Sequence, residues 1–217
     1  MTSVSLPGVD ARTTVVGSTG SGKTVFSVWL LSTRDIENRP WIIVDFKGDK
    51  LLASLGAKEI GFKTVPKEPG LYILRPLPGD EYELSDYMRR IWQQENIGVY
   101  IDEGTMIAKN DKWFRALLTQ GRSKHVEMII CSQRPLWLDK YVFTESTFFS
   151  IHNINYLEDR KHLAAYLDGN IPQRLDGHKS FWYDVAGQKL TKFAPVPQPD
   201  VLSAQFRERL AERPVIL

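Results

Sequence analysis

This chain of 217 residues has little cysteine and little histidine, and it lacks a long apolar run. Its single cysteine, Cys131, cannot form an intramolecular disulfide, which favours a reducing compartment. The four histidines are scattered without the spacing of a metal motif, so we expect no structural metal. The apolar run at residues 25–31 is short and is interrupted by Ser27, so we expect neither a signal peptide nor a transmembrane segment.

A strong charge imbalance is absent as well. The 28 basic and 26 acidic residues give a net charge of +2, which is too small for the whole surface to attract nucleic acid. Any polyanion must therefore be held locally. A composition of 42% apolar and 25% charged residues supplies a packed interior and excludes a disordered chain. The length fits one compact domain of ordinary size.

Runs of apolar and β-branched residues alternate with segments of helical periodicity. Strands are predicted at residues 13–16, 41–45, 71–74, 97–101, 126–131 and 147–151. Helices are predicted at residues 25–31, from an N-cap at Ser85 through Trp92, and at residues 113–124 and 157–167. A hairpin is predicted from residues 180–185 and 189–193.

This alternation predicts an α/β fold with a mainly parallel central sheet, helices on both faces and an antiparallel edge late in the chain. We expect the main domain to span residues 1–195. The proline-containing remainder, residues 196–217, is expected to be an extended C-terminal arm with a short helix at residues 202–211.

A phosphate-binding loop, the Walker A motif G-x-x-x-x-G-K-[ST], is matched in full between the first predicted strand and the first predicted helix. It consists of Gly17, Ser18, Thr19, Gly20, Ser21, Gly22, Lys23 and Thr24. The glycines let backbone N–H groups turn toward a phosphate, and the following helix presents its positive end to the same anion. Lys23 can reach the β- and γ-phosphate oxygens, and the Thr24 hydroxyl can bind Mg²⁺. A flexible Gly/Ser loop is the alternative interpretation.

Two adjacent carboxylates follow the strand predicted at residues 97–101. Parallel strands end at the same edge of a sheet, so Asp102 is expected beside the phosphate loop, where it can orient Mg²⁺. Glu103 can polarise an attacking water molecule as a general base. The alternative is an acidic strand end before a turn at Gly104.

A third polar strand end is the run Ser132-Gln133-Arg134-Pro135. Its Gln133 can donate to a γ-phosphate or hold the lytic water, unless it is only a structural amide in a turn. We expect Cys131, at the end of this strand, to be a buried small apolar residue rather than a nucleophile.

The order of these motifs resembles the FtsK/HerA superfamily of DNA-pumping ATPases. The resemblance covers residues 13–135 and includes Val44-Asp45-Phe46-Lys47 after the second strand and the pair Gly121-Arg122. The short chain is most similar to the genome-packaging ATPases of tailless, membrane-containing icosahedral viruses. The resemblance implies a RecA-like P-loop NTPase of the ASCE type that binds ATP and Mg²⁺ and translocates double-stranded DNA into a preformed capsid.

The resemblance also implies a ring of identical subunits, a hexamer in this family, with nucleotide at the interfaces and capsid or portal-vertex proteins as further partners. Arg122 is the first candidate for an arginine that reaches a neighbour's nucleotide, with Arg134 and Arg115 as alternatives. A solvated helix-end cation is the other interpretation of Arg122. We expect residues 104–112 to face DNA, and we expect the protein in the host cytoplasm, at the virion vertex, or in both.

Three other functions stay open on the sequence. A conjugation or filamentous-phage assembly ATPase shares these motifs, although such proteins usually carry membrane spans, and none is predicted here. A small-molecule or nucleoside kinase shares the Walker A motif, but the paired acids Asp102 and Glu103 disfavour it. A nucleotide-gated binding module without catalysis is the third alternative.

Overall fold

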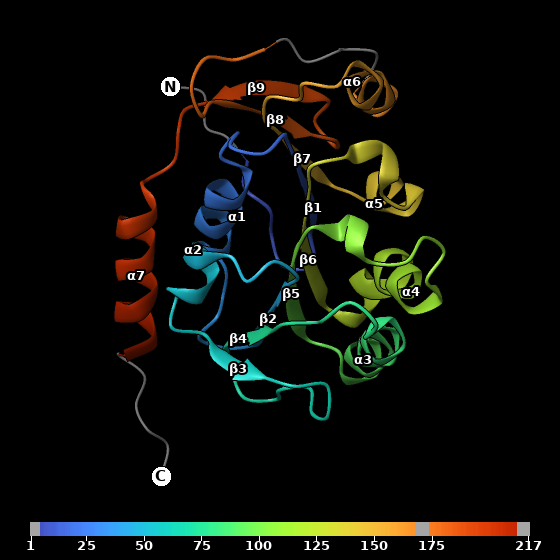
Figure 1. The fold of residues 1–217 in the computed structure, drawn as a ribbon, viewed down its shortest axis with the longest axis vertical. Helices are drawn as coiled ribbons and strands as arrows, with labels where there is room; N and C mark the ends of the chain where they lie inside the picture. The colour runs from blue at the N-terminus through green and yellow to red at the C-terminus, as the bar shows by residue number, and fades with distance from the viewer. Residues whose placement is uncertain (1–4, 168–173, 212–217) are drawn as a thin grey trace.

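The computed structural model describes residues 5–167 and 174–211. Within these ranges the strands form one nine-stranded sheet in the order β3-β4-β2-β5-β6-β1-β7-β8-β9 (Figure 1). The strands are β1 (Arg12–Val16), β2 (Pro40–Asp45), β3 (Lys58–Ile60), β4 (Gly70–Leu74), β5 (Ile97–Asp102), β6 (Val126–Ser132), β7 (Phe148–Ile151), β8 (Ser180–Asp184) and β9 (Lys189–Phe193).

The sheet is parallel from β3 to β7, and only β8 and β9 are antiparallel to their neighbours. This confirms the predicted mainly parallel sheet with a late antiparallel edge. The register pairs Val16 with Ser132 and Asp45 with Asp102, so β1, β6, β2 and β5 end together. We call the edge where these strands end the carboxyl edge, and the opposite one the amino edge.

Helices cover both faces of the sheet, as predicted (Figure 1). One face carries α1 (Lys23–Ser32), α2 (Lys50–Ala53) and α7 (Pro199–Ala211). The other carries α3 (Glu81–Gln94), α4 (Lys112–Gln120), α5 (Lys140–Thr144) and α6 (Leu157–Ala164). Short 3-10 turns, η1 (Gly104–Met106), η2 (Gly121–Lys124) and η3 (Pro135–Trp137), follow β5, α4 and β6 respectively.

Two hydrophobic cores result from the alternation of side chains along each strand. On β6, Ile129 and Cys131 pack toward α1, whereas Met128 and Ile130 pack toward α3 and α4. The central strands are buried on both faces and therefore read as continuous apolar runs in the sequence. Within the described ranges, no helix combines the length and apolar character that crossing a bilayer requires.

Several predicted helix boundaries are wrong. The helix expected at residues 157–167 ends at Ala164, and the one expected at residues 202–211 begins at Pro199. The helix expected to follow an N-cap at Ser85 begins at Glu81, because Asp80 is its N-cap and acidic residues in the first turn suit the positive helix end. Its apolar periodicity begins only at Leu84, which concealed the first turn. The helix expected at residues 113–124 ends at Gln120 and tightens into η2. The short elements β3, α2 and α5 were not predicted.

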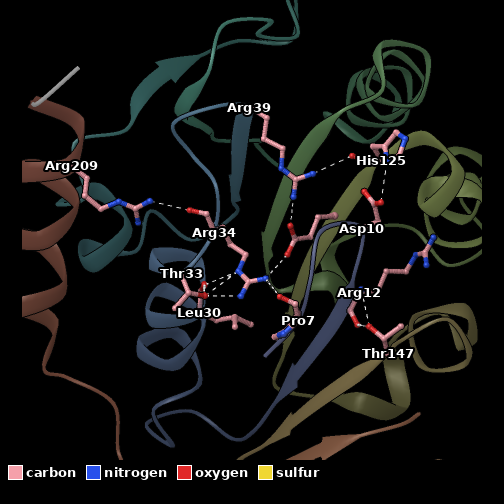
Figure 2. A network of polar contacts seen from close by, with 11 residues as sticks. Pro7, Asp10, Arg12, Leu30, Thr33, Arg34, Arg39, His125, Thr147 and Arg209 are labelled. Atoms are coloured by element: carbon pink, nitrogen blue, oxygen red, sulfur yellow. Dashed lines mark hydrogen bonds and ion pairs between the residues drawn. The ribbon is translucent and has the colours of Figure 1, made fainter. Parts of the chain in front are cut away.

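A buried ionic cluster holds the amino edge together (Figure 2). Glu127 on β6 accepts hydrogen bonds from Arg34, at 2.9 Å, and from Arg39. Arg209 of α7 donates to the Arg34 carbonyl at 3.0 Å, which ties the last described helix to the end of α1. This helix lies in the predicted arm, whose residues 212–217 are outside the described ranges.

Candidate active site

The phosphate loop lies at the carboxyl edge between β1 and α1. The Gly17 amide donates to the Ser132 carbonyl at 3.1 Å and the Ser18 amide donates to the Asn153 carbonyl at 2.8 Å, so β6 and the segment after β7 anchor its first half. Gly20 and Gly22 have φ values of 74° and 92°, which favour glycine. A side chain at Gly17 would lie 2.6 Å from the Cβ of His152, so the close approach of the loop to His152 also requires glycine.

The second half of the loop presents donors. Among the described residues, the amides of Gly20, Gly22 and Lys23 have no hydrogen-bond partner, and they lie at the N-terminal end of α1. Lys23 is buried beside them. Free amides, a helix N-terminus and an ammonium group together suit the phosphates of a nucleotide.

His152 supports this loop from below, a role that sequence reasoning missed. Its Nδ1 lies 3.2 Å from the Ser21 carbonyl and its Nε2 lies 3.2 Å from Ser150 Oγ. Burial lowers the pKa of His152 to about 4, against the opposing effect of the Ser21 carbonyl. The ring is therefore neutral near pH 7, and its Nδ1–H donates to the loop.

Asp102 ends β5 directly opposite the start of α1. Its Oδ1 lies 3.5 Å from Thr24 Oγ1 and accepts a hydrogen bond of 2.9 Å from the Tyr100 hydroxyl. Burial raises the pKa of Asp102, while Tyr100, Lys47 and Lys23 oppose that shift. A carboxylate facing a hydroxyl is a donor set of hard oxygens, which suits Mg²⁺.

Glu103, the next residue, has an unusual backbone conformation, and both oxygens of its carboxylate have partners within the chain. Its φ of 92° is strained for a residue other than glycine and turns the side chain toward β6. Oε1 accepts from Thr105 Oγ1 at 2.7 Å and from Ser132 Oγ at 3.1 Å, and Oε2 pairs with Lys47 Nζ at 2.8 Å. Burial opposes its ionisation, but Lys47 and the other donors outweigh burial and lower the pKa of Glu103.

Gln133 lies against the phosphate loop. Its Oε1 accepts a hydrogen bond of 2.6 Å from Thr19 Oγ1, so the end of β6 contacts the loop directly. Both residues line an open cavity of about 340 Å³. The other residues that line it are Ser18, Arg134, Asn155, Tyr156 and Asp159.

The three candidate arginines lie in different places. Arg122 belongs to η2 at the amino edge, where a side chain on Gly121 would lie 3.6 Å from Arg12 at the start of β1. It cannot reach the phosphate loop of its own chain, because β6 separates η2 from the carboxyl edge. Arg115 pairs with the buried Asp139 at 2.7 Å, away from the loop. Arg134 lines the cavity beside the loop.

The segment at residues 104–112 is tied to its neighbours. Asp139 accepts from the Asn110 amide at 3.1 Å, and Lys109 Nζ lies 3.4 Å from the Leu136 carbonyl. Met106, in η1, is exposed. The segment therefore links the end of β5 to the turn after β6.

A second cavity, of about 140 Å³, adjoins the loop at Gly22 and was not predicted. Its lining is mostly apolar and comes mainly from the start of α1 and from the proline-containing segment before α7. The lining residues are Gly22, Val25, Phe26, His178, Pro195, Val196, Pro197, Gln198 and Pro199. A flat apolar ring system fits such a lining better than a charged group does.

Comparison with known proteins agrees with this architecture, although no protein-family model matches the chain. The genome packaging NTPase B204 from Sulfolobus turreted icosahedral virus 2 superposes with a TM-score of 0.69 at 16% identity, over 87% of this chain and 99% of that one. EssC (ATPases 2 and 3) from Geobacillus thermodenitrificans gives a TM-score of 0.67 at 15% identity, over 94% of this chain and 44% of that one. The protein thus has the fold of the RecA-like P-loop ATPases.

Sequence similarity narrows the assignment within this class. The chain is 38% identical over 215 residues to the DNA packaging ATPase P9 of Enterobacteria phage PRD1, covering 94% of this chain and 95% of that protein. Similarity of this extent over nearly the whole length of both proteins shows common descent. The chain belongs to the viral DNA-packaging ATPases of the FtsK/HerA type.

Proposed function

We propose that this protein hydrolyses ATP and uses the free energy to move double-stranded DNA into a preformed viral capsid. The observation that carries the proposal is the convergence of the phosphate loop, Asp102 and Glu103 at one edge of the sheet. The relative from phage PRD1 is a DNA packaging ATPase, which supports DNA packaging as the use of that free energy.

The nucleotide would lie across the start of α1. The free amides of the loop and Lys23 bind its phosphates, with Ser18, Thr19 and Ser21 completing the loop. The adenine ring enters the apolar cavity beside Gly22 and packs against Phe26 and the prolines. The complexes of B204 with AMPPCP and with ATP-gammaS support a nucleotide as the ligand.

Thr24 and Asp102 would hold Mg²⁺, because their oxygens face each other across the site. When bound there, the ion would neutralise negative charge on the phosphate oxygens. Tyr100 orients the Asp102 carboxylate from below.

Hydrolysis would use Glu103 as the general base and Gln133 as the group that detects the γ-phosphate. Glu103 accepts a proton as the water oxygen attacks phosphorus, and ADP departs as the leaving group. Thr19 holds Gln133 by a hydrogen bond, so a movement of the phosphate loop on loss of the γ-phosphate would be transmitted to the end of β6. Arg122 contributes only if a neighbouring subunit presents it, which requires an oligomer such as a hexameric ring.

DNA would pass through such a ring, and capsid or portal-vertex proteins would anchor it at the virion vertex or in the host cytoplasm. Each subunit needs few basic contacts, because several copies share the DNA backbone. The small net charge of +2 is therefore compatible with DNA as the partner.

The test is the rate of ATP hydrolysis as a function of protein concentration, with and without duplex DNA. We expect a specific activity that rises with concentration and with DNA. Glu103→Gln should bind ATP and lose about 10²- to 10⁴-fold in turnover. ADP formation by wild-type protein only when a small-molecule acceptor is present, with the phosphoryl group transferred to that acceptor, would instead indicate a kinase. Unaltered hydrolysis by Glu103→Gln would refute the general base.

A further inference from the structure

Arg134 is held in place along one edge of its guanidinium. Its Nε donates to Asp159 Oδ2 at 2.9 Å, and Asp159 is completely buried. The guanidinium carbon lies 4.3 Å from the ring centroid of Trp137 and 4.7 Å from that of Tyr156. A buried carboxylate and two aromatic rings therefore fix the group, at distances typical of cation–π contacts.

The opposite edge of the guanidinium has no hydrogen bond to any residue that the structure describes. Asp159 uses its other oxygen to accept the Leu136 amide at 3.1 Å, and within the described part of the chain neither terminal nitrogen of Arg134 has a hydrogen-bond partner. The cavity of about 340 Å³ that Arg134 lines is shared with Ser18 and Thr19 of the phosphate loop and with Gln133. Arg134 thus belongs to the wall of the cavity that adjoins the phosphate loop.

A role in packing alone does not account for this arrangement. Arg115 is an arginine of this chain with a structural role, and it offers a comparison. Its Nε pairs with the buried Asp139, and its guanidinium lies 5.1 Å from the Tyr141 ring. Its Nη2, however, also donates to Asn110. Arg134 has the same carboxylate and aromatic support, but among the described residues its two terminal nitrogens have no such further acceptor.

We propose that Arg134 binds the γ-phosphate of the nucleotide held by its own chain, so that the arginine acts within the subunit and not on a neighbour. The proposal rests on the proposed function and adds a γ-phosphate-binding residue to that site. Planar paired donors match phosphate oxygens, and Asp159 with the two rings sets their direction in advance. Arg134 would therefore distinguish a triphosphate from a diphosphate.

The test compares ATPγS and ADP binding by calorimetry at concentrations where the protein is monomeric. We expect Arg134→Gln to weaken ATPγS binding about 10- to 100-fold, the range of a hydrogen bond to a charged group, and to leave ADP binding nearly unchanged. Arg115→Gln is the matched control, since it removes an arginine of similar support outside the cavity and should not change the ratio of the two affinities.

The outcomes separate the two proposals. Wild-type protein that binds neither nucleotide would overturn the proposed function and this inference together. Wild-type protein that prefers ATPγS, with the same preference in Arg134→Gln, would overturn the inference alone. Equal weakening of ATPγS and ADP, with lowered thermal stability, would show that Arg134 only fastens α6 to the turn after β6.

A mixing experiment tests whether the arginine acts within the subunit. Lys23→Ala has an intact Arg134 but cannot bind phosphate, and Arg134→Gln has an intact Lys23. If Arg134 acts on its own chain, oligomers that contain both variants, isolated by two affinity tags, have no more activity than Arg134→Gln alone. Activity above that level would mean that a neighbour supplies the arginine, and would overturn the inference.

Discussion

Lys47 Nζ lies 2.8 Å from Glu103 Oε2 and joins the ends of β2 and β5 across the carboxyl edge. The other carboxylate oxygen is already occupied by fixed hydroxyl and amide donors of Thr105, Ser132 and Gln133. Lys47 is the long and partly exposed partner, with 40% of its side chain accessible. The ion pair between Lys47 and Glu103 is therefore the contact that can break, so that Glu103 can accept a proton from water.

Lys47→Met should raise ATP hydrolysis in the absence of DNA by about 2- to 5-fold, because a partly exposed ion pair contributes less than about 1 kcal/mol. The measurement is steady-state turnover at saturating ATP. Lys50→Met is a suitable control, since Lys50 lies on the neighbouring α2 and has no ion pair within the described ranges. A tenfold fall in turnover for Lys47→Met would show that Lys47 assists the chemistry instead of holding its base.

Tyr100→Phe should weaken the response to Mg²⁺ about 10-fold, because the Asp102 carboxylate loses the hydrogen bond that orients it. We expect the concentration of Mg²⁺ that gives half-maximal hydrolysis to rise, with a smaller change in turnover at saturating Mg²⁺. Tyr87→Phe removes a buried hydroxyl that bonds the Thr64 carbonyl instead, and should leave the Mg²⁺ titration unchanged. Identical titrations for Tyr100→Phe and wild type would contradict this assignment.

His152 should make folding stability depend on pH. Burial lowers its pKa to about 4, and an unfolded histidine titrates near 6.5, so the unfolded chain binds the extra proton first as the pH falls. Stability is complete above about pH 6.5 and falls by up to about 3 kcal/mol between there and pH 4.

Urea unfolding at a series of pH values measures this dependence. His152→Asn keeps a donor for the Ser21 carbonyl and should flatten the profile between pH 4 and 6.5. His125→Asn changes an exposed ring and is the control. The prediction fails if both variants retain the slope of the wild type.

Glu127→Ala should destabilise the fold by about 3–5 kcal/mol, because it leaves Arg34 and Arg39 buried without their carboxylate (Figure 2). The free energy of unfolding in urea measures the loss. Glu95→Ala removes one partner of the more exposed pair with Lys124 and should cost less than about 1 kcal/mol. Comparable losses in the two variants would mean that the buried cluster contributes no more than a surface pair.

The functional residues at the strand ends could be predicted, because each belongs to a short motif of consecutive residues. The phosphate loop is a run of eight consecutive residues, and its combination of glycines and a lysine is specific for phosphate binding. Asp102, Glu103 and Gln133 each follow an apolar run. The parallel sheet followed from alternating strands and helices, and parallel strands bring their ends to one edge. The polar start of α3 and the 3-10 turn after α4 were missed because neither has apolar periodicity.

The groups that support those residues could not be found in the same way. His152 is 131 residues from Ser21, and it reaches the loop only because β7 pairs with β1. Lys47 and Arg134 stand in motifs that the sequence shows, but their ion pairs with Glu103 and Asp159 are visible only in the structure.

The sequence alone determined the class of fold, the phosphate loop and the acids at the strand ends, because hydrophobic periodicity and short motifs are properties of neighbouring residues. The tertiary structure decided the partners of those acids, the two cavities beside the loop and the edge on which each arginine lies. These depend on contacts between segments far apart in the chain, and strand order and helix packing, which no local pattern encodes, determine those contacts.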